Sequence, residues 1–285
     1  MSNLEKGFPD VKTIQSVMYQ VGDGEKLRVL KFEPKVKEVN NHTIIFIPGF
    51  MGLFDQWNKM LNGLLLCGYT LYVIETREKK SSTATHKSDR ISQEGFAQDI
   101  AEIMDQLQIS SPYTFMGTSL GTGVIIYQII HNSNLSKKPE KLILLNPIYK
   151  SEHVIHLIRA SYLPSIFFNL IIKSFILFAP ITMAKVKKKD PFLYNIRIES
   201  LKQAPLRKMR RALQISKNKS VFNELPWVNI PSLIISKNGD KEHPFNQAIE
   251  IANFLHDTIF IDIFSEEIMH DSQTVYFINN FLNNS

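Results

Sequence analysis

Cysteine is almost absent from this sequence, which has one, Cys67, among its 285 residues. A single cysteine cannot form an intramolecular disulfide, so the disulfide-stapled folds of secreted proteins are excluded and a reducing compartment is expected. The stretch 1–15 has charged and polar residues but no apolar segment, so a secretory signal is not expected. Internal repeats and low-complexity tracts are also absent, which argues against a solenoid or a disordered chain. Together these absences predict a cytoplasmic location, with association with a membrane left open by the basic segment described next.

Charge is moderate in amount but unevenly spread. With 44% hydrophobic and 21% charged residues, the composition is that of an ordinary globular protein, long enough for one large α/β domain with an inserted subdomain. Residues 151–221 contain fourteen Lys or Arg and three Asp or Glu, which gives +11, whereas the remainder has nineteen against twenty-four, which gives −5. Such a basic insertion is either a solvated face or a surface attracted to anionic lipid or to an acidic partner. A nucleic-acid partner is not expected, because no recognition motif accompanies the charge.

A G-x-S-x-G motif runs from Gly117 to Gly121 and reads Gly-Thr-Ser-Leu-Gly. A short apolar run, 113–116, precedes it, and an apolar segment with helical character, 124–130, follows it. Strand, sharp turn and helix are the setting in which this motif forms a nucleophile elbow, since only small residues fit beside the strained serine. The pattern therefore predicts that the Ser119 hydroxyl lies at the carboxyl edge of a sheet, beside helix amides that can receive negative charge.

Short apolar runs alternate with segments of helical periodicity along most of the chain. The run 43–47 is apolar throughout, as in a strand buried on both faces, whereas 94–107 places its apolar residues on one helical face. Alternating strands and helices imply an α/β protein with a mostly parallel sheet and helices on both faces. Strands are expected at 13–20, 26–33, 43–47, 70–74, 113–116, 141–145, 231–236 and 258–264, and helices at 57–65, 94–107, 124–130, 245–255 and 272–282.

The alternation breaks between residues 151 and 223, where the sequence is mostly helical. The expected organisation is therefore a core made of 1–150 and 224–285, with 151–223 as a helical insertion. In parallel α/β sheets, ligands bind beyond the carboxyl ends of the strands. The residues expected at that edge are Pro48, Gly49, Phe50, Glu75, Ser119, Asn146 and Asp240.

Over essentially its whole length the chain resembles the α/β-hydrolase fold superfamily. The motifs that carry the likeness are, in chain order, Pro48-Gly-Phe-Met-Gly52, the elbow at Ser119, Asn146-Pro147, the helical insertion, Lys237-Asn-Gly-Asp240 and Met269-His270-Asp271. The resemblance implies an α/β-hydrolase fold with a mostly parallel eight-stranded sheet and a helical cap formed by 151–223. It also implies the chemistry of a serine esterase, lipase or thioesterase, with no cofactor and no metal ion.

Three residues match the catalytic triad of that superfamily, in the chain order nucleophile, acid, base. Ser119 is the expected nucleophile, and a serine hydroxyl needs a neighbouring base because it is weakly reactive alone. His270 is the expected base, because none of the seven other histidines precedes the last helix in this way. Asp240 is the expected acid, which fixes the imidazole tautomer. Glu242 is the alternative acid, whereas Asn146 cannot ionise.

The resemblance also implies an oxyanion hole made of two backbone amides, those of Phe50 and Leu120. Each such donor is worth about 3 kcal/mol of transition-state stabilisation. Relatives often have a histidine where Pro48 stands, which leaves open how this loop is anchored. The loop 75–82 departs from the superfamily pattern and receives no catalytic role, and Arg77 within it is expected to bind backbone carbonyls below the site.

The insertion contains a strongly apolar segment, 165–178, with a narrow polar stripe at helical spacing. Pro180 is expected to interrupt this helix, and a cluster of lysines follows. Three interpretations stay open: a cap helix over an apolar acyl pocket, an interfacial helix on an anionic membrane, and a membrane span. The span is disfavoured because Lys173 lies in the middle of the segment.

The sequence as a whole predicts a serine hydrolase that cleaves a carboxylic ester or thioester of an apolar acyl group through an acyl-enzyme. The cap residues expected to contact the acyl group are Phe167, Phe168 and Phe175. Two alternatives remain: a non-catalytic protein of the same fold that binds a ligand or partner, and an acyltransferase or lyase, since fold does not settle function. Peripheral contact with an anionic membrane through the basic cap is a further expectation.

Overall fold

The computed structural model describes residues 7–9, 11–36, 40–110, 112–131, 138–149, 155–215, 222–240 and 243–284. This part of the chain contains one eight-stranded sheet with the strand order β1-β2-β4-β3-β5-β6-β7-β8. The strands are β1 (Val11–Gln20), β2 (Lys26–Pro34), β3 (Thr43–Ile47), β4 (Thr70–Ile74), β5 (Tyr113–Thr118), β6 (Lys141–Leu145), β7 (Ser232–Lys237) and β8 (Thr258–Ile263).

The central strands explain why the sheet is mostly parallel. Every residue of β3 and β5 is buried, so both faces of the sheet must be covered, which requires helical crossovers between successive strands. The strands from β4 through β3, β5, β6 and β7 to β8 pair in parallel. The pairs β1–β2 and β2–β4 are antiparallel, and β1 and β2 form the expected hairpin. The predicted mostly parallel eight-stranded sheet is therefore confirmed.

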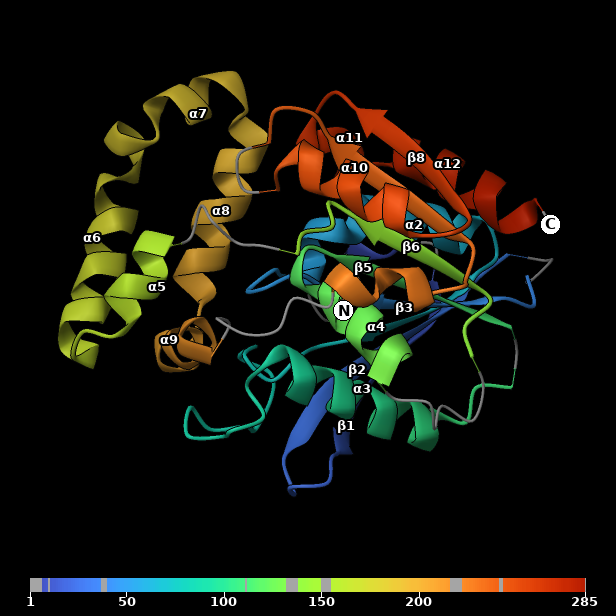
Figure 1. Cartoon of the computed structure of the whole chain (residues 1–285), viewed down its shortest axis with the longest axis horizontal. Helices are drawn as coiled ribbons and strands as arrows, with labels where there is room; N and C mark the ends of the chain where they lie inside the picture. The colour runs from blue at the N-terminus through green and yellow to red at the C-terminus, as the bar shows by residue number, and fades with distance from the viewer. Residues whose placement is uncertain are drawn as a thin grey trace.

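Helices cover both faces of this sheet (Figure 1). Because successive side chains of a strand point to opposite faces, Ile45 and Ile47 pack with α3, α4 and α10, whereas Ile44 and Phe46 pack with α2 and α12. The core helices are η1 (Phe54–Trp57), α2 (Asn58–Leu66), α3 (Gln93–Leu107), α4 (Leu120–His131), η3 (Phe222–Trp227), α10 (Phe245–Phe254), α11 (Glu266–His270) and α12 (Ser272–Asn283).

The helical insertion stands at one side of the sheet, at the left of Figure 1. The sequence predicts that Pro180 interrupts its long apolar helix, but α6 continues through this residue to Thr182, so that prediction is wrong. Pro180 lies in the last turn, where the loss of one N–H donor is tolerated and the Met183 amide still closes the turn on the Ala179 carbonyl at 2.9 Å. The insertion helices are α5 (Ile155–Ser161), α6 (Ser165–Thr182), α7 (Ala184–Lys189), α8 (Pro191–Gln203) and α9 (Leu206–Ile215).

The strand register brings the loops after β3, β5, β6 and β7 together at one edge of the sheet. Ile47 is opposite Gly117, and Leu145 is opposite both Thr118 and Ile235. One further segment at this edge differs from expectation: the sequence predicts a loop between β8 and α12, but α11 forms there. The reason is local, because the Ser265 side chain caps its N-terminus by accepting a hydrogen bond from the amide of Ile268.

Candidate active site

Ser119 occupies the turn between β5 and α4 with a left-handed backbone, φ 50°. Residues other than glycine rarely adopt this conformation, so the surrounding structure must hold it. The Ser119 amide donates a hydrogen bond to the carbonyl of Leu145 on the neighbouring strand, at 3.0 Å. A methyl group on Gly121 would lie 2.1 Å from the carbonyl oxygen of Ile47. A methyl group on Gly117 would lie 2.8 Å from the carbonyl carbon of Gly121. The turn therefore has the backbone of a nucleophile elbow, with glycine required on both sides of the serine.

The loop 48–52 after β3 lies directly against Ser119. A Cβ atom on Gly49 would be 3.3 Å from the Cβ of Ser119, which is tighter than an ordinary contact and favours glycine at this position. The Gly52 amide donates to the Gly49 carbonyl at 3.0 Å, so the loop folds back on itself in a tight turn. The backbone of this loop is thus held beside the serine side chain.

The two amides predicted to form the oxyanion hole belong to segments adjacent to Ser119. Phe50 follows Gly49 in the loop 48–52, and Leu120 is the first residue of α4. The first amides of a helix have no acceptor within the helix, so Leu120 stands where a negatively charged oxygen is favoured. Both residues are thus adjacent in the chain to groups that contact or include Ser119, and their role as an oxyanion hole stays a prediction.

Lys79, in the loop 75–82 after β4, anchors the loop that contacts Ser119. Its buried ammonium donates a hydrogen bond to the carbonyl of Gly49 and lies 3.0 Å from Oε1 of Glu78. Lys208 of α9 donates in turn to the carbonyl oxygens of Lys79 and Ser82, each at 2.9 Å. Sequence reasoning assigned no catalytic role to this loop and no role to Lys79, although the run of charged residues directly after a buried strand was a usable signal.

His270 is the last residue of α11 and is buried. Its ring stacks on Trp57 with the ring centres 3.8 Å apart and meets Phe192 of α8 edge-on at 5.3 Å. Nδ1 lies 2.9 Å from the carbonyl oxygen of Gln56, and Nε2 lies 3.6 Å from Oε1 of Glu266. Because a carbonyl oxygen only accepts, Nδ1 carries the proton in this arrangement. Both ring nitrogens therefore face partners other than the predicted nucleophile.

Asp240 follows β7, and its carboxylate lies within hydrogen-bond distance of a different histidine. Its Oδ2 lies 2.8 Å from Nδ1 of His243, and it forms no hydrogen bond with His270. The structure thus brings the elbow together with the loop 48–52, called the oxyanion loop below after its predicted role. It does not assemble Ser119, Asp240 and His270 as a triad. That assignment stays a prediction, and the alternative acid, Glu242, lies outside the described residues.

Glu266 is the carboxylate nearest to His270 in the described structure, and sequence reasoning missed it. It is buried, and both of its oxygens lie 3.4 Å from Nδ2 of Asn146, the residue that follows β6 with φ 45°. The side-chain Oδ1 of Asn146 accepts a hydrogen bond from the Lys237 amide at 3.1 Å, so the ends of β6 and β7 are tied to α11. The available signal was an acidic residue four positions before the histidine. Within the described ranges, no group of three or more His, Cys, Asp or Glu side chains could hold a metal ion.

Arg77 has a structural role that differs from the predicted one. Its fully buried guanidinium binds the carboxylates of Asp99 and Asp23, not backbone carbonyls, so the prediction is wrong. A buried cation needs an anionic partner, and the fold supplies buried Asp99 from α3 and the more exposed Asp23 from the hairpin turn. The hydrogen bond from Arg77 lowers the pKa of Asp23 below its ordinary value.

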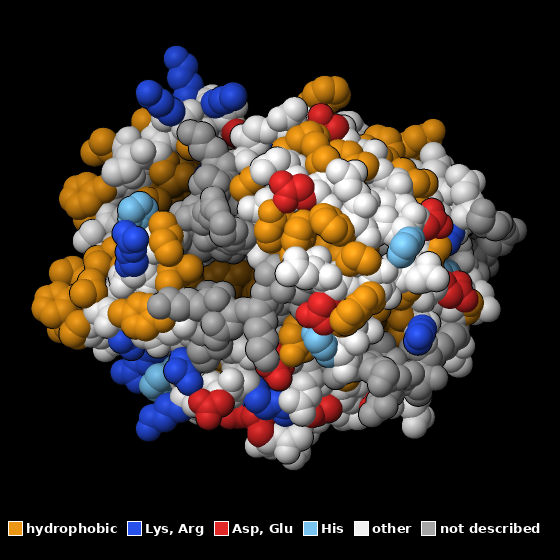
Figure 2. Space-filling model, viewed as in Figure 1, with side chains coloured by type: hydrophobic (Ala, Val, Ile, Leu, Met, Phe, Trp, Pro, Cys, Tyr) orange, Lys and Arg blue, Asp and Glu red, His pale blue; other side chains and the backbone are white. Residues whose placement is uncertain are grey.

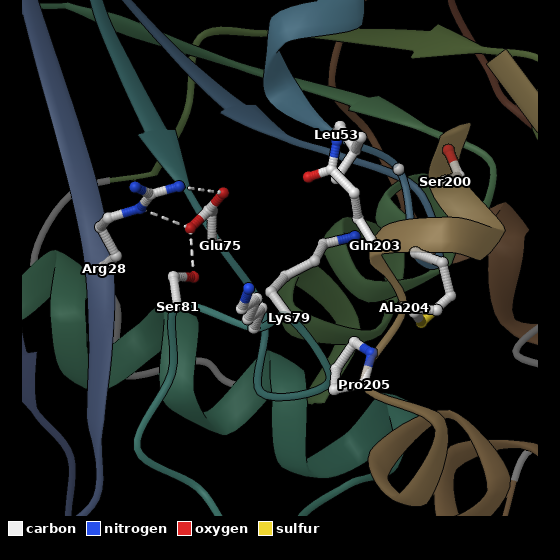
Figure 3. A pocket seen from close by; sticks show the side chains of 12 residues that line it. Arg28, Leu53, Glu75, Lys79, Ser81, Ser200, Gln203, Ala204 and Pro205 are labelled. Carbon is white, nitrogen blue, oxygen red and sulfur yellow. Dashed lines mark hydrogen bonds and ion pairs between the residues drawn. The ribbon is translucent and has the colours of Figure 1, made fainter. Parts of the chain in front are cut away.

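A cavity of about 240 Å³ borders the oxyanion loop on the side of the cap (Figure 3). Figure 3 shows the guanidinium of Arg28 bound to both oxygens of Glu75, at 2.7 and 2.9 Å, with Ser81 donating to the same carboxylate. The end of α8 and the two residues after it, Ala204 and Pro205, close the opposite wall. Ser119 and His270 do not line this cavity. It therefore lies beside the elbow and is not the pocket into which the Ser119 hydroxyl opens. Its lining is Arg28, Met51, Gly52, Leu53, Glu75, Lys79, Lys80, Ser81, Ser200, Gln203, Ala204 and Pro205.

The three cap phenylalanines predicted to contact an acyl group lie in two different environments. Phe168 is fully buried in a cluster with Met51, and Phe50 packs against that cluster, so the cap core covers the oxyanion loop. Phe167 and Phe175 are on the outer side of α6, where 55% and 39% of their surfaces are exposed. None of the three lines the described cavity.

Comparisons with known proteins agree with this geometry. A family model described as alpha/beta hydrolase fold matches residues 42–154. The structure is similar to an esterase from Exiguobacterium antarcticum, with 16% identity, a TM-score of 0.71, and coverage of 94% of this chain and 98% of that one. It is also similar to an enol-lactonase from Burkholderia xenovorans, with 14% identity, a TM-score of 0.72, and coverage of 94% and 100%.

A bromoperoxidase from Bacillus anthracis gives a similar result, with 16% identity, a TM-score of 0.68, and coverage of 95% of this chain and 100% of that one. The search of curated proteins gives no match. Identities this low establish a shared fold, and the three names belong to different chemistries.

Proposed function

Because the chain belongs to the α/β-hydrolase fold superfamily, we propose that it is a serine hydrolase with Ser119 as its nucleophile. One observation carries this proposal: Ser119 has φ 50°, and a Cβ atom on Gly49 of the loop 48–52 would be 3.3 Å from its own Cβ. A strained residue of this kind persists only where the surrounding structure holds it, and such strain is concentrated at functional sites. The half-buried serine also stands at the N-terminus of α4, where developing negative charge is stabilised.

In the proposed reaction, Ser119 Oγ attacks the carbonyl carbon of the substrate while His270 takes the hydroxyl proton. The carbonyl π electrons move onto the oxygen, which the amides of Phe50 and Leu120 stabilise. Collapse of this intermediate expels an alcohol or thiol, protonated by His270, and leaves the acyl group on Ser119. Water then attacks the acyl-enzyme as His270 accepts a water proton, and Ser119 regains its proton as the carboxylic acid leaves.

The first step requires His270 to exchange partners. In the described structure its Nδ1 donates to the carbonyl of Gln56, whereas the reaction needs one ring nitrogen at Ser119 and the other at an acid. Phe192 of α8 contacts the ring edge-on, so a shift of the cap and a shift of the imidazole are linked. We propose Asp240 as that acid, with Glu266 as its competitor because it already lies 3.6 Å from Nε2.

The proposed substrate is a carboxylic ester or thioester with an apolar acyl group. Two similar structures are named an esterase and an enol-lactonase. The cluster around Phe168 presents apolar side chains to Phe50 and Met51, next to the elbow. A cytoplasmic location is proposed with it, supported by the single cysteine, which cannot form an intramolecular disulfide.

A second candidate is a non-catalytic protein that keeps the fold and binds a ligand or partner. The contacts of His270 with Gln56 and Glu266, and of Asp240 with His243, favour it, because neither ring nitrogen of His270 is directed to Ser119. An acyltransferase or lyase on the same fold would share the nucleophile and differ in what accepts the acyl group.

The test is labelling with a fluorophosphonate, followed by a chain-length series of p-nitrophenyl esters. We expect the wild-type protein and Ser81→Ala, which changes a serine of the neighbouring cavity, to be labelled, and Ser119→Ala to lose all labelling. Labelling that survives in Ser119→Ala would overturn the nucleophile assignment. A folded wild-type protein that is neither labelled nor active on any ester would favour the non-catalytic candidate.

A further inference from the structure

The outer face of α6 is apolar and uncovered. Eight large apolar residues of this helix are exposed. Its buried residues are Phe168, Ile172 and Ala179, which face the other helices of the cap. Of the helices in the described part of the chain, α6 is the one long and apolar enough to cross a membrane, and 17% of it is buried. Soluble monomers seldom expose apolar surface of this extent without a partner.

The exposed residues form a stripe along one face of the helix, interrupted in its middle turn by Lys173 and Ser174. Ile166, Leu170, Leu177 and Ile181 recur at helical spacing and are 72%, 60%, 72% and 75% exposed, the most exposed apolar side chains of α6. Figure 1 shows α6 on the outer side of the cap, turned away from the sheet. The stripe is therefore not part of the cap core and does not face the elbow.

Positive charge borders this stripe and negative charge is missing from it. Residues 155–189 contain six Lys or Arg, at positions 159, 173, 185, 187, 188 and 189, and no Asp or Glu. All six are exposed. Figure 2 shows hydrophobic side chains along the outer edge of the cap and basic side chains gathered over α7, where α6 ends. An apolar face bordered by lysines matches the interface of a bilayer, where acyl chains lie beneath anionic headgroups.

A second copy of this chain fits the face less well. A symmetric dimer through α6 would place the same six positive charges opposite one another, without an acidic side chain from 155–189 to compensate them. A membrane-spanning α6 also fits poorly. It would pull Phe168 and Ile172 out of the cap core and place Lys173 in hydrocarbon, whereas at an interface this lysine reaches the headgroups.

We propose that the outer face of α6, together with the lysines of α7, binds the surface of a membrane that contains anionic lipids. The helix lies along the interface with its apolar stripe among the upper acyl chains, and Lys187, Lys188 and Lys189 contact the headgroups. The cap then lies between the bilayer and the elbow. This binding does not depend on hydrolase activity, so it is tested separately from the proposed function.

The experiment is co-sedimentation of the full-length protein with phosphatidylcholine vesicles, with and without phosphatidylserine, at low and high salt. We expect binding to vesicles that contain phosphatidylserine, weakened by salt because screening removes the part contributed by the lysines. Leu170→Glu/Leu177→Glu should lower binding at least tenfold. Its matched control, Leu66→Glu/Phe264→Glu, adds the same charges at exposed apolar positions outside the cap and should bind as the wild type does.

A second pair of variants tests the charges. Replacing Lys187, Lys188 and Lys189 by glutamine should lower the affinity for anionic vesicles roughly a hundredfold, from about one kcal/mol per lysine. The same replacement at exposed Lys12, Lys35 and Lys138 should have little effect.

Three results would overturn the proposal: no sedimentation of wild type with anionic vesicles, equal loss of binding in both members of a pair, or a solution dimer that Leu170→Glu/Leu177→Glu converts to a monomer. The last result would assign the face to a second copy of the chain. Sedimentation velocity without vesicles, on the same proteins, measures it.

Discussion

The ammonium group of Lys79 donates a hydrogen bond to the carbonyl oxygen of Gly49, from the side of the oxyanion loop that faces the cap. Relatives often have a histidine where this chain has Pro48, so the loop needs another anchor. Lys79 provides it from the loop after β4, and Lys208 of the cap binds the carbonyl of Lys79 at 2.9 Å. These two contacts link the cap to the backbone that contacts Ser119.

Lys79→Met is therefore expected to lower kcat by roughly 10²-fold with little change in KM. If the loop shifts, its amide loses hydrogen bonding to the oxyanion of the transition state, whereas binding of the substrate is less affected. Lys80→Met is the matched control, since Lys80 lines the same cavity but is exposed. Steady-state kinetics on one p-nitrophenyl ester measures both. A parallel loss in the two variants would contradict a positioning role for Lys79.

Stability needs its own control, because Lys79→Met leaves the fully buried carboxylate of Glu78 without its partner at 3.0 Å. Removing one member of a buried ion pair costs about 3 to 5 kcal/mol. The double variant Glu78→Gln/Lys79→Met should recover much of the free energy of unfolding without recovering kcat. Recovery of kcat with stability would mean that Lys79 acts only by keeping the protein folded.

The second prediction concerns the glycines of α4. Gly121→Ala should lower the free energy of unfolding by about 3 kcal/mol, because the added methyl meets the backbone carbonyl of Ile47 at 2.1 Å and backbone cannot move aside. Gly123→Ala, two residues along the same helix, meets only the end of the flexible Gln93 side chain at 2.9 Å. Displacing Gln93 disturbs its hydrogen bond to the Gly123 carbonyl at 2.8 Å, which offsets the better helix propensity of alanine, so Gly123→Ala should cost at most about 1 kcal/mol. Urea unfolding of both variants decides, and equal destabilisation would contradict the elbow geometry.

The third prediction identifies the acid that serves His270. Asp240→Asn should reduce turnover on the order of 10⁴, because the imidazole loses its tautomer control while the shape is kept. Glu266→Gln should have a smaller effect, since it preserves the contact with Asn146. Ester turnover and fluorophosphonate labelling rates are measured for both. If Glu266→Gln shows the large loss and Asp240→Asn does not, the role belongs to Glu266.

The fourth prediction concerns acid pH and the junction between cap and core. Asp190 caps α8 through the Leu193 amide and binds Nζ of Lys237, the last residue of β7, each at 2.9 Å. Burial raises the pKa of Asp190, but these two partners outweigh it, so the pKa is lower than in the unfolded chain. The stability from this carboxylate is therefore present above the unfolded pKa and is lost as pH falls through the lowered one.

Asp190→Asn removes the charge and keeps an acceptor for the cap. At pH 7 it should cost about 0.5 to 1 kcal/mol relative to wild type, and this difference should vanish below the lowered pKa, where both side chains are neutral. Urea unfolding across this pH range measures it, with exposed Asp105→Asn as control. A difference that persists in strong acid would show that the amide disturbs packing instead.

Much of the fold can be predicted from local sequence patterns. The run 43–47 is apolar at every position, so it predicts a strand buried on both faces, and β3 is that strand. The elbow was predictable for a similar reason. A side chain on Gly117 would clash with backbone only four residues away, and one on Gly121 would clash with the adjacent strand β3. Short α11 was missed because five residues carry too little periodicity, and Pro180 was misjudged because its position in the last turn is set by where the helix ends.

The candidate site was only partly predictable, because side-chain pairing depends on distances between segments far apart in the chain. The sequence by itself determined the alternation of strands and helices, the strained serine and the apolar, basic character of the insertion. Only the tertiary structure decided that Lys79 reaches Gly49, that Arg77 is neutralised by Asp99 and that His270 lies against Trp57. It also decided which face of α6 is covered: burial requires a facing surface, and the cap provides one for Phe168 but none for Leu170 or Leu177.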